Sequence, residues 1–429
     1  MIRLLRQAVI AELASPGELV FDFGHWRMFH DAVWKQALDW LDLSGLALYF
    51  WQKFRSIDGQ AALPPLVEAH LARCHEDNCS RVSAIKAESA KLNSLFEHAG
   101  VRYALLKGIA LTPDYCPDPT LRTQYDHDYL IRPDSLARAE EALQKAEYTP
   151  RVSGEDRHIA YFGQARDGAS SKEPAGLYSA RLGRPIELHI RLWDRAEENF
   201  EVEVPNDLLG RARRCMWQCV EYWALSEEDG LLFQVLHAFR HILRNWCRLS
   251  IFLEISHFLR KRASDADFWA RYCSRTRSLR WVPEAGAVVF GLAERLFGSG
   301  VPPEVKAHMK TRFCPVMDLW IERYGVSAAL LNFRNNKHSL FLHREFVDDA
   351  STWKGFLKRR LIPVRRPHRL PCVLNRSPRV WGRRWSQWRH ALQRFKFHFF
   401  SLLAFAWEYP RWHVVRARRV MVCPKPAAV

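Results

Sequence analysis

Two aspartates, Asp126 and Asp128, have the spacing of a carboxylate pair that can share a metal ion. They fall in the stretch from Tyr125 to Ile131, whose apolar residues predict a β-strand. Side chains two apart on a strand project from the same face, so both carboxylates would lie together with His127 on the other side. Mg²⁺ is typically held by one or two carboxylates, with substrate phosphates and water completing about six oxygens. The pair therefore favours phosphoryl or nucleotidyl chemistry, although the same spacing is frequent at solvated strand ends.

A glycine turn precedes this pair. The apolar run from Val101 to Leu106 predicts a short strand, and Lys107-Gly108 then opens what we expect to be a helix. Free backbone N–H groups at a helix start favour phosphate, and glycine lets the backbone approach it closely. Gly108 is therefore a candidate phosphate-binding residue, the alternative being an ordinary turn glycine.

A third carboxylate lies on a later predicted strand, Pro185 to Trp193, where Glu187 and His189 alternate. Placed beside the aspartates, Glu187 would complete a site for two metal ions about 3.5–4 Å apart. The alternative is that Glu187 is an ordinary surface residue. His189 is either a packed histidine or a hydrogen-bond partner of a metal-binding carboxylate.

In order and spacing, these segments resemble the uncharacterised nucleotidyltransferase family of the polymerase-beta superfold, over roughly residues 25 to 345. The run from Arg122 to Tyr125 departs from the family, because relatives usually have a proline and a small residue there, and His127 replaces a usual aliphatic residue. The resemblance rests on Leu105-Leu106-Lys107-Gly108, Tyr115-x-Pro117-Asp118-Pro119, Leu121-Arg122, Asp126-x-Asp128 and Glu187-Leu188-His189.

This resemblance implies an enzyme that uses Mg²⁺ or Mn²⁺ to transfer a nucleoside monophosphate from a nucleoside triphosphate such as ATP to a hydroxyl acceptor. By position, Asp126, Asp128 and Glu187 take the catalytic and metal-binding roles. Gly108 would form the backbone turn that contacts phosphate, and Lys107 and Arg122 would offset the negative charge of the triphosphate.

The remaining pattern predicts an α+β protein, with a small mixed β-sheet core flanked by helical layers at both ends and a basic amphipathic helical tail. Within the first layer, Ile85, Leu92, Leu95 and Phe96 form a predicted buried stripe. A helix is expected from Ser135 to Glu147, and a strand at His158 to Phe162. We expect an N-terminal helical region (1–96), the nucleotidyltransferase core (97–204), a C-terminal helical domain (205–350) and the tail (351–429).

The tail carries the net charge of the molecule. From Lys354 to the C-terminus there are nineteen Lys or Arg residues and one acid, Glu408, while the whole chain has a net charge of +17. Aromatic and aliphatic residues recur there at steps of three or four, which predicts an amphipathic helix. Residues 354–429 are therefore expected to meet an anionic partner, and we favour a membrane surface over nucleic acid because the apolar stripe is continuous. The alternative is a solvated basic helix folded onto the core.

Two further expectations follow from composition. The N-terminal apolar stretch is broken by Glu12, which argues against a secretory signal, so we expect a cytoplasmic protein peripheral to the membrane. The ten cysteines are scattered and are expected to be reduced core thiols, although Cys215 and Cys219, one helical turn apart if helical, retain a metal or redox alternative. A competing hypothesis for the whole chain is a non-catalytic scaffold with a degenerate nucleotidyltransferase core.

Overall fold

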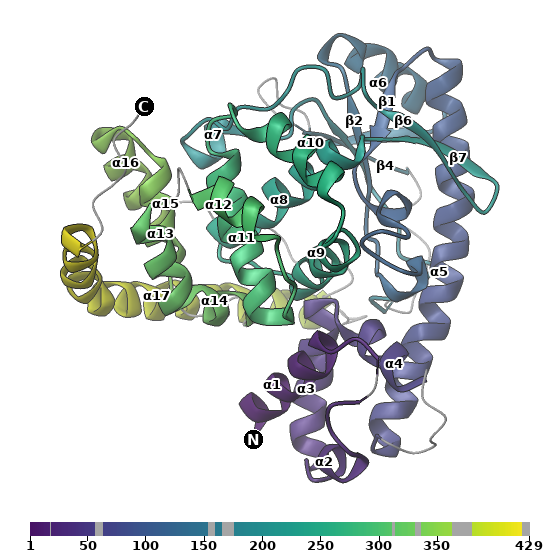
Figure 1. Cartoon of the computed structure of the whole chain (residues 1–429). Helices are drawn as coiled ribbons and strands as arrows, with labels where there is room; N and C mark the ends of the chain where they lie inside the picture. Colours follow the sequence, from purple (N-terminus) through teal and green to yellow (C-terminus); the bar gives the residue numbers. More distant parts are fainter. Residues whose placement is uncertain are drawn as a thin grey trace.

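The computed structural model describes residues 1–17, 19–55, 63–152, 159–164, 176–310, 314–330, 336–362 and 380–422. It is a mixed α+β molecule in which one sheet lies between helices from both ends of the chain (Figure 1). The predicted fold class, a mixed sheet flanked by helical layers, is confirmed at this level.

The described strands form one seven-stranded sheet in the order β3-β4-β5-β2-β1-β7-β6. Strand β2 pairs antiparallel with β1 and parallel with β5, and β1 pairs parallel with β7, so the sheet is mixed. The strands are β1 (Tyr103–Leu105), β2 (His127–Ile131), β3 (Tyr148–Val152), β4 (Ile159–Gln164), β5 (Ile186–His189), β6 (Arg213–Trp217) and β7 (Val220–Ala224).

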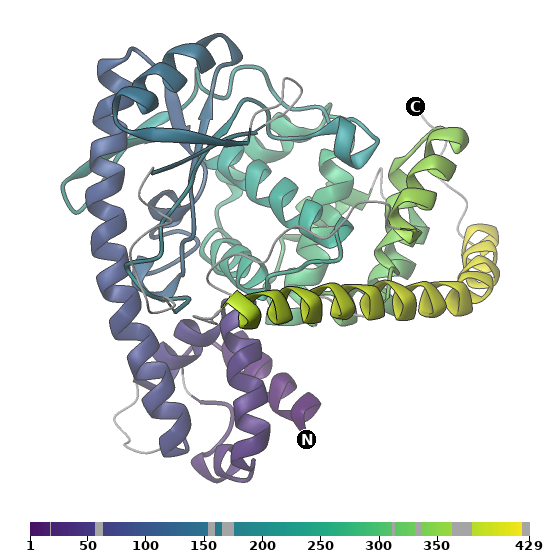
Figure 2. The same ribbon diagram turned by 180° about the vertical axis from the view of Figure 1, so that it is seen from behind.

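One face of the sheet is covered by two helices, α5 (Pro65–His98) and α6 (Leu136–Lys145). Alternate residues of the strands, including Tyr129 and Leu188, pack with α5 in a compact apolar core. In the predicted stripe on α5, Ile85, Leu92 and Phe96 are buried and Leu95 is half-buried. Pro65 stands at the first turn of α5, where its missing N–H would have no helical partner. The long α5 runs along the whole edge of the molecule (Figures 1 and 2).

The opposite face of the sheet is covered by the C-terminal helices, which share one large apolar core with the N-terminal helices. The N-terminal helices are α1 (Ile2–Ala14), α2 (Phe23–Arg27), α3 (Asp31–Ser44) and α4 (Ala47–Arg55). The short α7 (Arg195–Glu198) lies between β5 and β6. After the last strand come α8 (Glu227–Leu243), α9 (Leu249–Lys261), α10 (Ala266–Thr276), α11 (Val282–Phe297), α12 (Pro303–Lys310), α13 (Pro315–Trp320), α14 (Val326–Leu330), α15 (Ser339–His343), α16 (Ala350–Leu361) and α17 (Val380–Val422).

Several local predictions are corrected by the structure. Gly108 opens only a four-residue 3₁₀ turn, Gly108–Leu111, and not a helix. The interpretation of Cys215 and Cys219 as helical neighbours is wrong, because Cys215 lies on β6 and Cys219 in the turn before β7. This edge hairpin also extends the sheet beyond residue 204, where we expected the core to end. Its outer strand is mostly exposed, so it lacks the apolar alternation that marks a strand.

Other predicted elements agree in type and differ in length. The strand expected from Tyr125 begins at His127, and the one expected from Pro185 to Trp193 covers only Ile186–His189. The predicted strand at His158 to Phe162 is β4, with His158 itself outside the described residues. Within the predicted tail the structure describes two helices, α16 (Ala350–Leu361) and the long α17 (Val380–Val422). Among the described residues, no helix has the length and apolar character needed to cross a membrane.

Candidate active site

The three predicted carboxylates meet on the face of the sheet opposite α5. Strands β2 and β5 run parallel with Asp128 directly beside Glu187, so both side chains share one face. Asp126 lies two residues before Asp128, just outside β2. Its carboxylate interacts with those of both Asp128 and Glu187. The structure thus brings together three acids from two segments about sixty residues apart.

Asp128 is at the centre of this group. Its side chain is fully buried, and Oδ1 accepts a hydrogen bond from Lys107 Nζ at 2.7 Å. His189 Nε2 lies 3.0 Å from the same Oδ1 and 3.6 Å from Glu187 Oε2. The second oxygen of Asp128, Oδ2, is buried and has no hydrogen-bond partner among the described residues. A buried carboxylate oxygen without a partner is costly, and a cation would satisfy it.

The electrostatics of the group show an excess of negative charge. Burial and then the neighbouring Asp128 charge raise the pKa of Asp126 to about 7. Burial also acts to raise the pKa of Asp128, but the Lys107 ammonium and the hydrogen bond with His189 outweigh it and hold that pKa well below its usual range. Burial opposes the charge on Lys107, yet the surrounding carboxylates raise its pKa. The Lys107 ammonium and the guanidinium group of Arg240, which also interacts with Asp128 and Glu187, therefore offset part of the charge of the three carboxylates.

The donor set suits a hard divalent cation. Oxygens of Asp128 and Glu187 and a nitrogen of His189 all lie within 4.8 Å of one another, close enough to contact one ion. Carboxylate oxygens are the ligands that Mg²⁺ and Mn²⁺ prefer. We call Asp126, Asp128 and Glu187 the carboxylate side of the site. His189, for which the sequence allowed either packing or support of a carboxylate, contacts oxygens of both Asp128 and Glu187 directly.

Two of the three residues predicted to bind the triphosphate, Gly108 and Arg122, are engaged by other side chains, and we call these two the nucleotide side. Gly108 has a φ of +68°, and a Cβ there would lie 2.4 Å from Gln124 Oε1. The cavity beside these residues measures only about 10 Å³, which is room for about one water molecule. The positive φ and the close side chain explain why glycine is needed at position 108.

Arg122 is also engaged. Its Nε lies 3.2 Å from Glu254 Oε1 on α9, and both side chains are buried. Burial acts to lower the pKa of Arg122, but the Glu254 carboxylate outweighs it and the pKa is raised. The guanidinium would therefore have to exchange Glu254 for a phosphate to take the role predicted for it.

Comparison with known proteins decides the family. The chain matches the family model described as uncharacterised nucleotidyltransferase over residues 30–298, which is more than half of its 429 residues. The chain belongs to this family. Neither a search of curated proteins nor a search of solved structures finds a significant match. Membership supports a transferase that acts on nucleotides.

In this nucleotidyltransferase, helix α5 holds the segment that carries the aspartates. Arg81 donates to the Gln124 carbonyl oxygen from Nε at 2.8 Å and from Nη2 at 2.7 Å. Asn78 Nδ2 donates to the Thr120 carbonyl at 2.7 Å. These polar residues lie one turn apart on α5 and fix the loop before Asp126. Sequence reasoning missed them, because polar residues on a long helix carry no sign of a distant backbone partner.

The departures from the usual family residues have partners of their own. His127 Nε2 lies 3.0 Å from Glu88 Oε2, and Arg184 Nε donates to the same oxygen at 2.6 Å. The Tyr125 ring lies between the guanidinium groups of Arg81 and Arg248, at 5.5 and 5.2 Å from its centroid. The unusual side chains thus replace family packing with polar and cation–π contacts, and the aspartates keep their positions.

Helix α8 completes the surroundings of the nucleotidyltransferase site. Burial, and then the charge of Lys107, lower the pKa of His237 well below its usual value, and burial lowers that of His241 to about 3. Both histidines are therefore neutral at pH 7. Gln234 Nε2 donates to the Leu106 carbonyl at 3.1 Å, which fixes the backbone just before Lys107.

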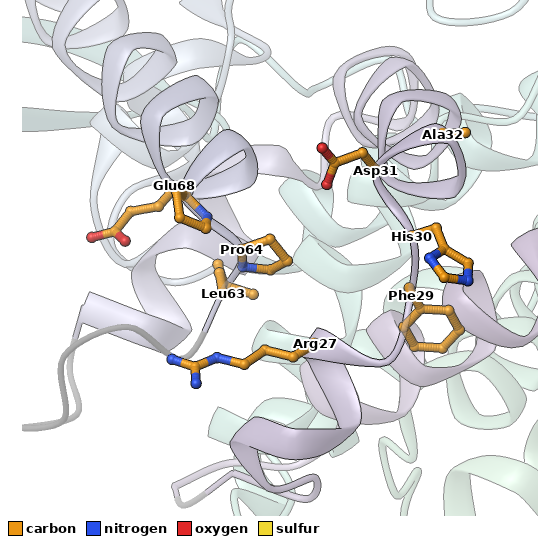
Figure 3. A pocket seen from close by; sticks show the side chains of 9 residues that line it. Arg27, Phe29, His30, Asp31, Ala32, Leu63, Pro64 and Glu68 are labelled. Atoms are coloured by element: carbon orange, nitrogen blue, oxygen red, sulfur yellow. The ribbon is translucent and has the colours of Figure 1, made fainter.

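Two other features of the nucleotidyltransferase lie away from this site. Asp42, His70 and Cys74 form a second group of metal-binding residue types, in which His70 Nε2 lies 3.1 Å from Asp42 Oδ2. Burial raises the pKa of Cys74 to about 12, so its thiol is protonated. A pocket of about 690 Å³ lies between the start of α3 and the start of α5, with Arg27, Asp31 and Glu68 among its lining (Figure 3). None of the three site carboxylates lines this pocket.

Proposed function

We propose that the chain transfers a nucleoside monophosphate from a nucleoside triphosphate to a hydroxyl group, with Mg²⁺ or Mn²⁺ held by Asp126, Asp128 and Glu187. Family membership supports nucleotidyl transfer in general. The single observation that carries the metal-dependent form is the buried Oδ2 of Asp128, which no nitrogen or hydroxyl donor of the described residues reaches, beside two further carboxylates. A divalent ion bound there would polarise the α-phosphate and draw the triphosphate into line with the acceptor.

The remaining steps belong to the protein's own residues. The acceptor oxygen forms a bond to the α-phosphorus, the bond to pyrophosphate breaks, and the hydroxyl proton passes to a nearby carboxylate. Lys107, held at 2.7 Å from Asp128, is placed to offset charge on the phosphates. His189 keeps the Asp128 carboxylate oriented, at 3.0 Å from Oδ1. The sheet supplies rigidity, since Asp128 and Glu187 are neighbours in register.

The test is release of pyrophosphate, or labelling of an acceptor or of the chain itself, with each of the four nucleoside triphosphates and Mg²⁺. Activity should depend on the divalent ion and should fall by at least about 10³-fold in an Asp126→Asn, Asp128→Asn double variant. A matched control is His70→Ala, which alters the other metal-type group and should leave activity unchanged. Equal activity in the double variant and the wild type would contradict the proposal.

A second candidate is a non-catalytic scaffold with a degenerate core, and the contacts that other side chains make with Gly108 and Arg122 favour it. The cavity beside Gly108 holds about one water molecule, and Arg122 is paired with Glu254. Under this alternative, titration with nucleoside triphosphates and Mn²⁺ yields no binding heat. Saturable binding without turnover would indicate a nucleotide-responsive scaffold, and turnover would exclude the alternative.

A further inference from the structure

Helix α17 packs on the protein with one face only. Ser401, Phe405 and Trp412 are buried, and they recur at helical spacing on that face. The Phe405 ring stacks on Phe341 of α15 with centroids 4.9 Å apart. The same face carries Glu408, whose Oε1 accepts a hydrogen bond from Tyr324 at 2.8 Å. These contacts fix the rotation of the helix about its axis and so determine which residues point outward.

The opposite face of α17 is apolar and uncovered. In Figure 2 the helix runs along the outside of the C-terminal helices, and no other helix or strand lies over it. At about 100° per residue, the outward residues fall within roughly 40° of one line, which lies about 140° around the helix from the mean direction of the buried Ser401, Phe405 and Trp412. We call this set the outer stripe, and its side chains are between 50 and 79 % exposed: Trp381, Trp385, Trp388, Leu392, Phe395 and Phe399.

An exposed stripe of this kind is unusual for a surface in water. Trp and Phe expose large apolar areas here, and contiguous apolar patches normally mark a site of interaction. The stripe extends over five turns of helix, so it is long and narrow, unlike a pocket for a small molecule. Trp is the residue that most favours the boundary between lipid and water, because its ring is apolar and its N–H can reach a polar partner.

Basic residues flank the outer stripe on both sides. Arg384 lies about 60° to one side of its centre, and Lys396 and Arg389 lie about 60° and 80° to the other. All three are exposed. The single acid of α17, Glu408, is on the buried face and is paired with Arg323 at 2.7 Å. The outward surface of the helix is therefore apolar at its centre and positive at its edges.

We propose that α17 lies flat on an anionic phospholipid surface, with the outer stripe inserted at the level of the headgroups and its flanking cations on the lipid phosphates. Long basic side chains can reach from a half-inserted helix to the headgroups. Because no described helix can cross a bilayer, this is an attachment to the surface. The charge pattern disfavours a second copy of the chain as the occupant, since two such helices would bring their cations together. The proposal does not depend on the transferase activity.

The test is flotation of the full chain with vesicles of phosphatidylcholine alone and of phosphatidylcholine mixed with phosphatidylglycerol. Wild type should float with the anionic vesicles and at least about ten-fold less well with the neutral ones, because each basic residue near the surface changes affinity about five-fold. The variant Trp385→Gln, Trp388→Gln, Phe395→Gln should lose flotation. A matched control, Met28→Gln, Leu43→Gln, Met216→Gln, changes three side chains with similar exposure elsewhere and should float like wild type.

Any of four results would overturn the proposal. Wild type and the stripe variant could float equally well, or wild type could float with neither the anionic nor the neutral vesicles. Alternatively, wild type could form a dimer that the stripe variant loses, which would make the outer stripe an interface between copies. Finally, the wild type could retard a nucleic-acid duplex in a gel and bind no vesicles, which would assign the flanking cations to nucleic acid. Circular dichroism of each variant ensures that loss of flotation is not loss of the helix.

Discussion

The carboxylate side and the nucleotide side of the site differ in how completely they are assembled. On the carboxylate side, Asp128, Glu187 and His189 already lie within 4.8 Å of one another, and one buried oxygen lacks a partner. On the nucleotide side, Gln124 lies over Gly108 and Arg122 is paired with Glu254. The first side is ready for a cation, whereas on the second Arg122 must leave Glu254 and Gln124 must move before a triphosphate can contact Arg122 and Gly108.

The difference follows from what holds each side. The carboxylates project from neighbouring strands in register, and ladder hydrogen bonds fix such positions. Gly108 and Gln124 belong to a short 3₁₀ turn and a loop, where the Gln124 side chain can leave Gly108 by a rotamer change that gives up one hydrogen bond, from its Nε2 to the Asp126 carbonyl at 2.7 Å. The carboxylates are already in place for a metal ion, whereas side chains on the nucleotide side must first change rotamer. We therefore expect metal binding to precede nucleotide binding and to assist it.

Replacing the central carboxylate tests the assembled side and should have the largest effect. Asp128→Asn should lower transfer by on the order of 10³-fold and destabilise the fold by about 3–5 kcal/mol, because the buried Lys107 ammonium loses its ion partner. The measurements are pyrophosphate release and denaturant unfolding. The matched variant Lys107→Met, Asp128→Asn should regain most of the stability and none of the activity. Full activity in the single variant would show that the assembled side is not catalytic.

The pH dependence of stability tests the charge excess on the same side. An acid whose pKa is raised on folding, here from 3.8 to about 7 for Asp126, stabilises the fold less as pH rises through that range. Asp126→Asn should therefore become more stable than wild type by a few kcal/mol between about pH 4 and 7, and Mg²⁺ should stabilise only the wild type. Thermal unfolding with and without Mg²⁺ measures both effects.

The comparison between variant and wild type matters in this experiment, because other groups titrate nearby. The pKa values of His237 and His241 are lowered, so both histidines stabilise the fold increasingly as pH rises through their unfolded value of 6.5. Their contribution has the opposite sign and cancels in the difference. A difference that does not vary with pH would mean that Asp126 does not carry the excess charge.

Opening the nucleotide side should have a smaller effect. Gln124→Ala removes the side chain over Gly108, and it keeps the backbone carbonyl that Arg81 binds. If the Gln124 side chain over Gly108 limits access, the dissociation constant for a triphosphate should fall by about 3–10-fold, because a larger fraction of the protein molecules can then bind it. Calorimetric titration measures it, with Gly108→Ala as the opposite change. Weaker binding by Gln124→Ala would show instead that this amide contacts the nucleotide.

The smallest effect is expected at the unusual residue between the aspartates. His127→Leu restores the aliphatic character usual in the family, and it leaves the Glu88–Arg184 pair in place. The buried Nδ1 of His127 has no hydrogen-bond partner among the described residues. Its removal therefore also removes the desolvation cost of an unpaired buried nitrogen. The free energy of unfolding should change by less than about 1 kcal/mol and transfer should be unchanged. A large loss of activity would assign the histidine a role in the site.

What the sequence could predict was the part of the site set by local periodicity. Alternation along β2 and β5 places Asp128 and Glu187 on one face each, and parallel pairing then brings them together. The 3₁₀ turn at Gly108 and the edge hairpin at Cys215 were missed, because neither has a regular apolar period. The hydrogen bonds from Arg81 could not be predicted for another reason, because their acceptor, the Gln124 carbonyl, is forty-three residues away in the sequence. Long-range polar contacts leave no local pattern in a sequence.

The most direct test of the account is the binding of Mn²⁺, measured by electron paramagnetic resonance, to wild type and to Glu187→Gln. Both residues at position 187 have the same size, so the fold should be unaffected. We predict that wild type binds Mn²⁺ and that Glu187→Gln binds it at least about ten-fold more weakly, while His70→Ala is unchanged. Equal binding by wild type and Glu187→Gln would contradict the claim that these carboxylates converge on one cation.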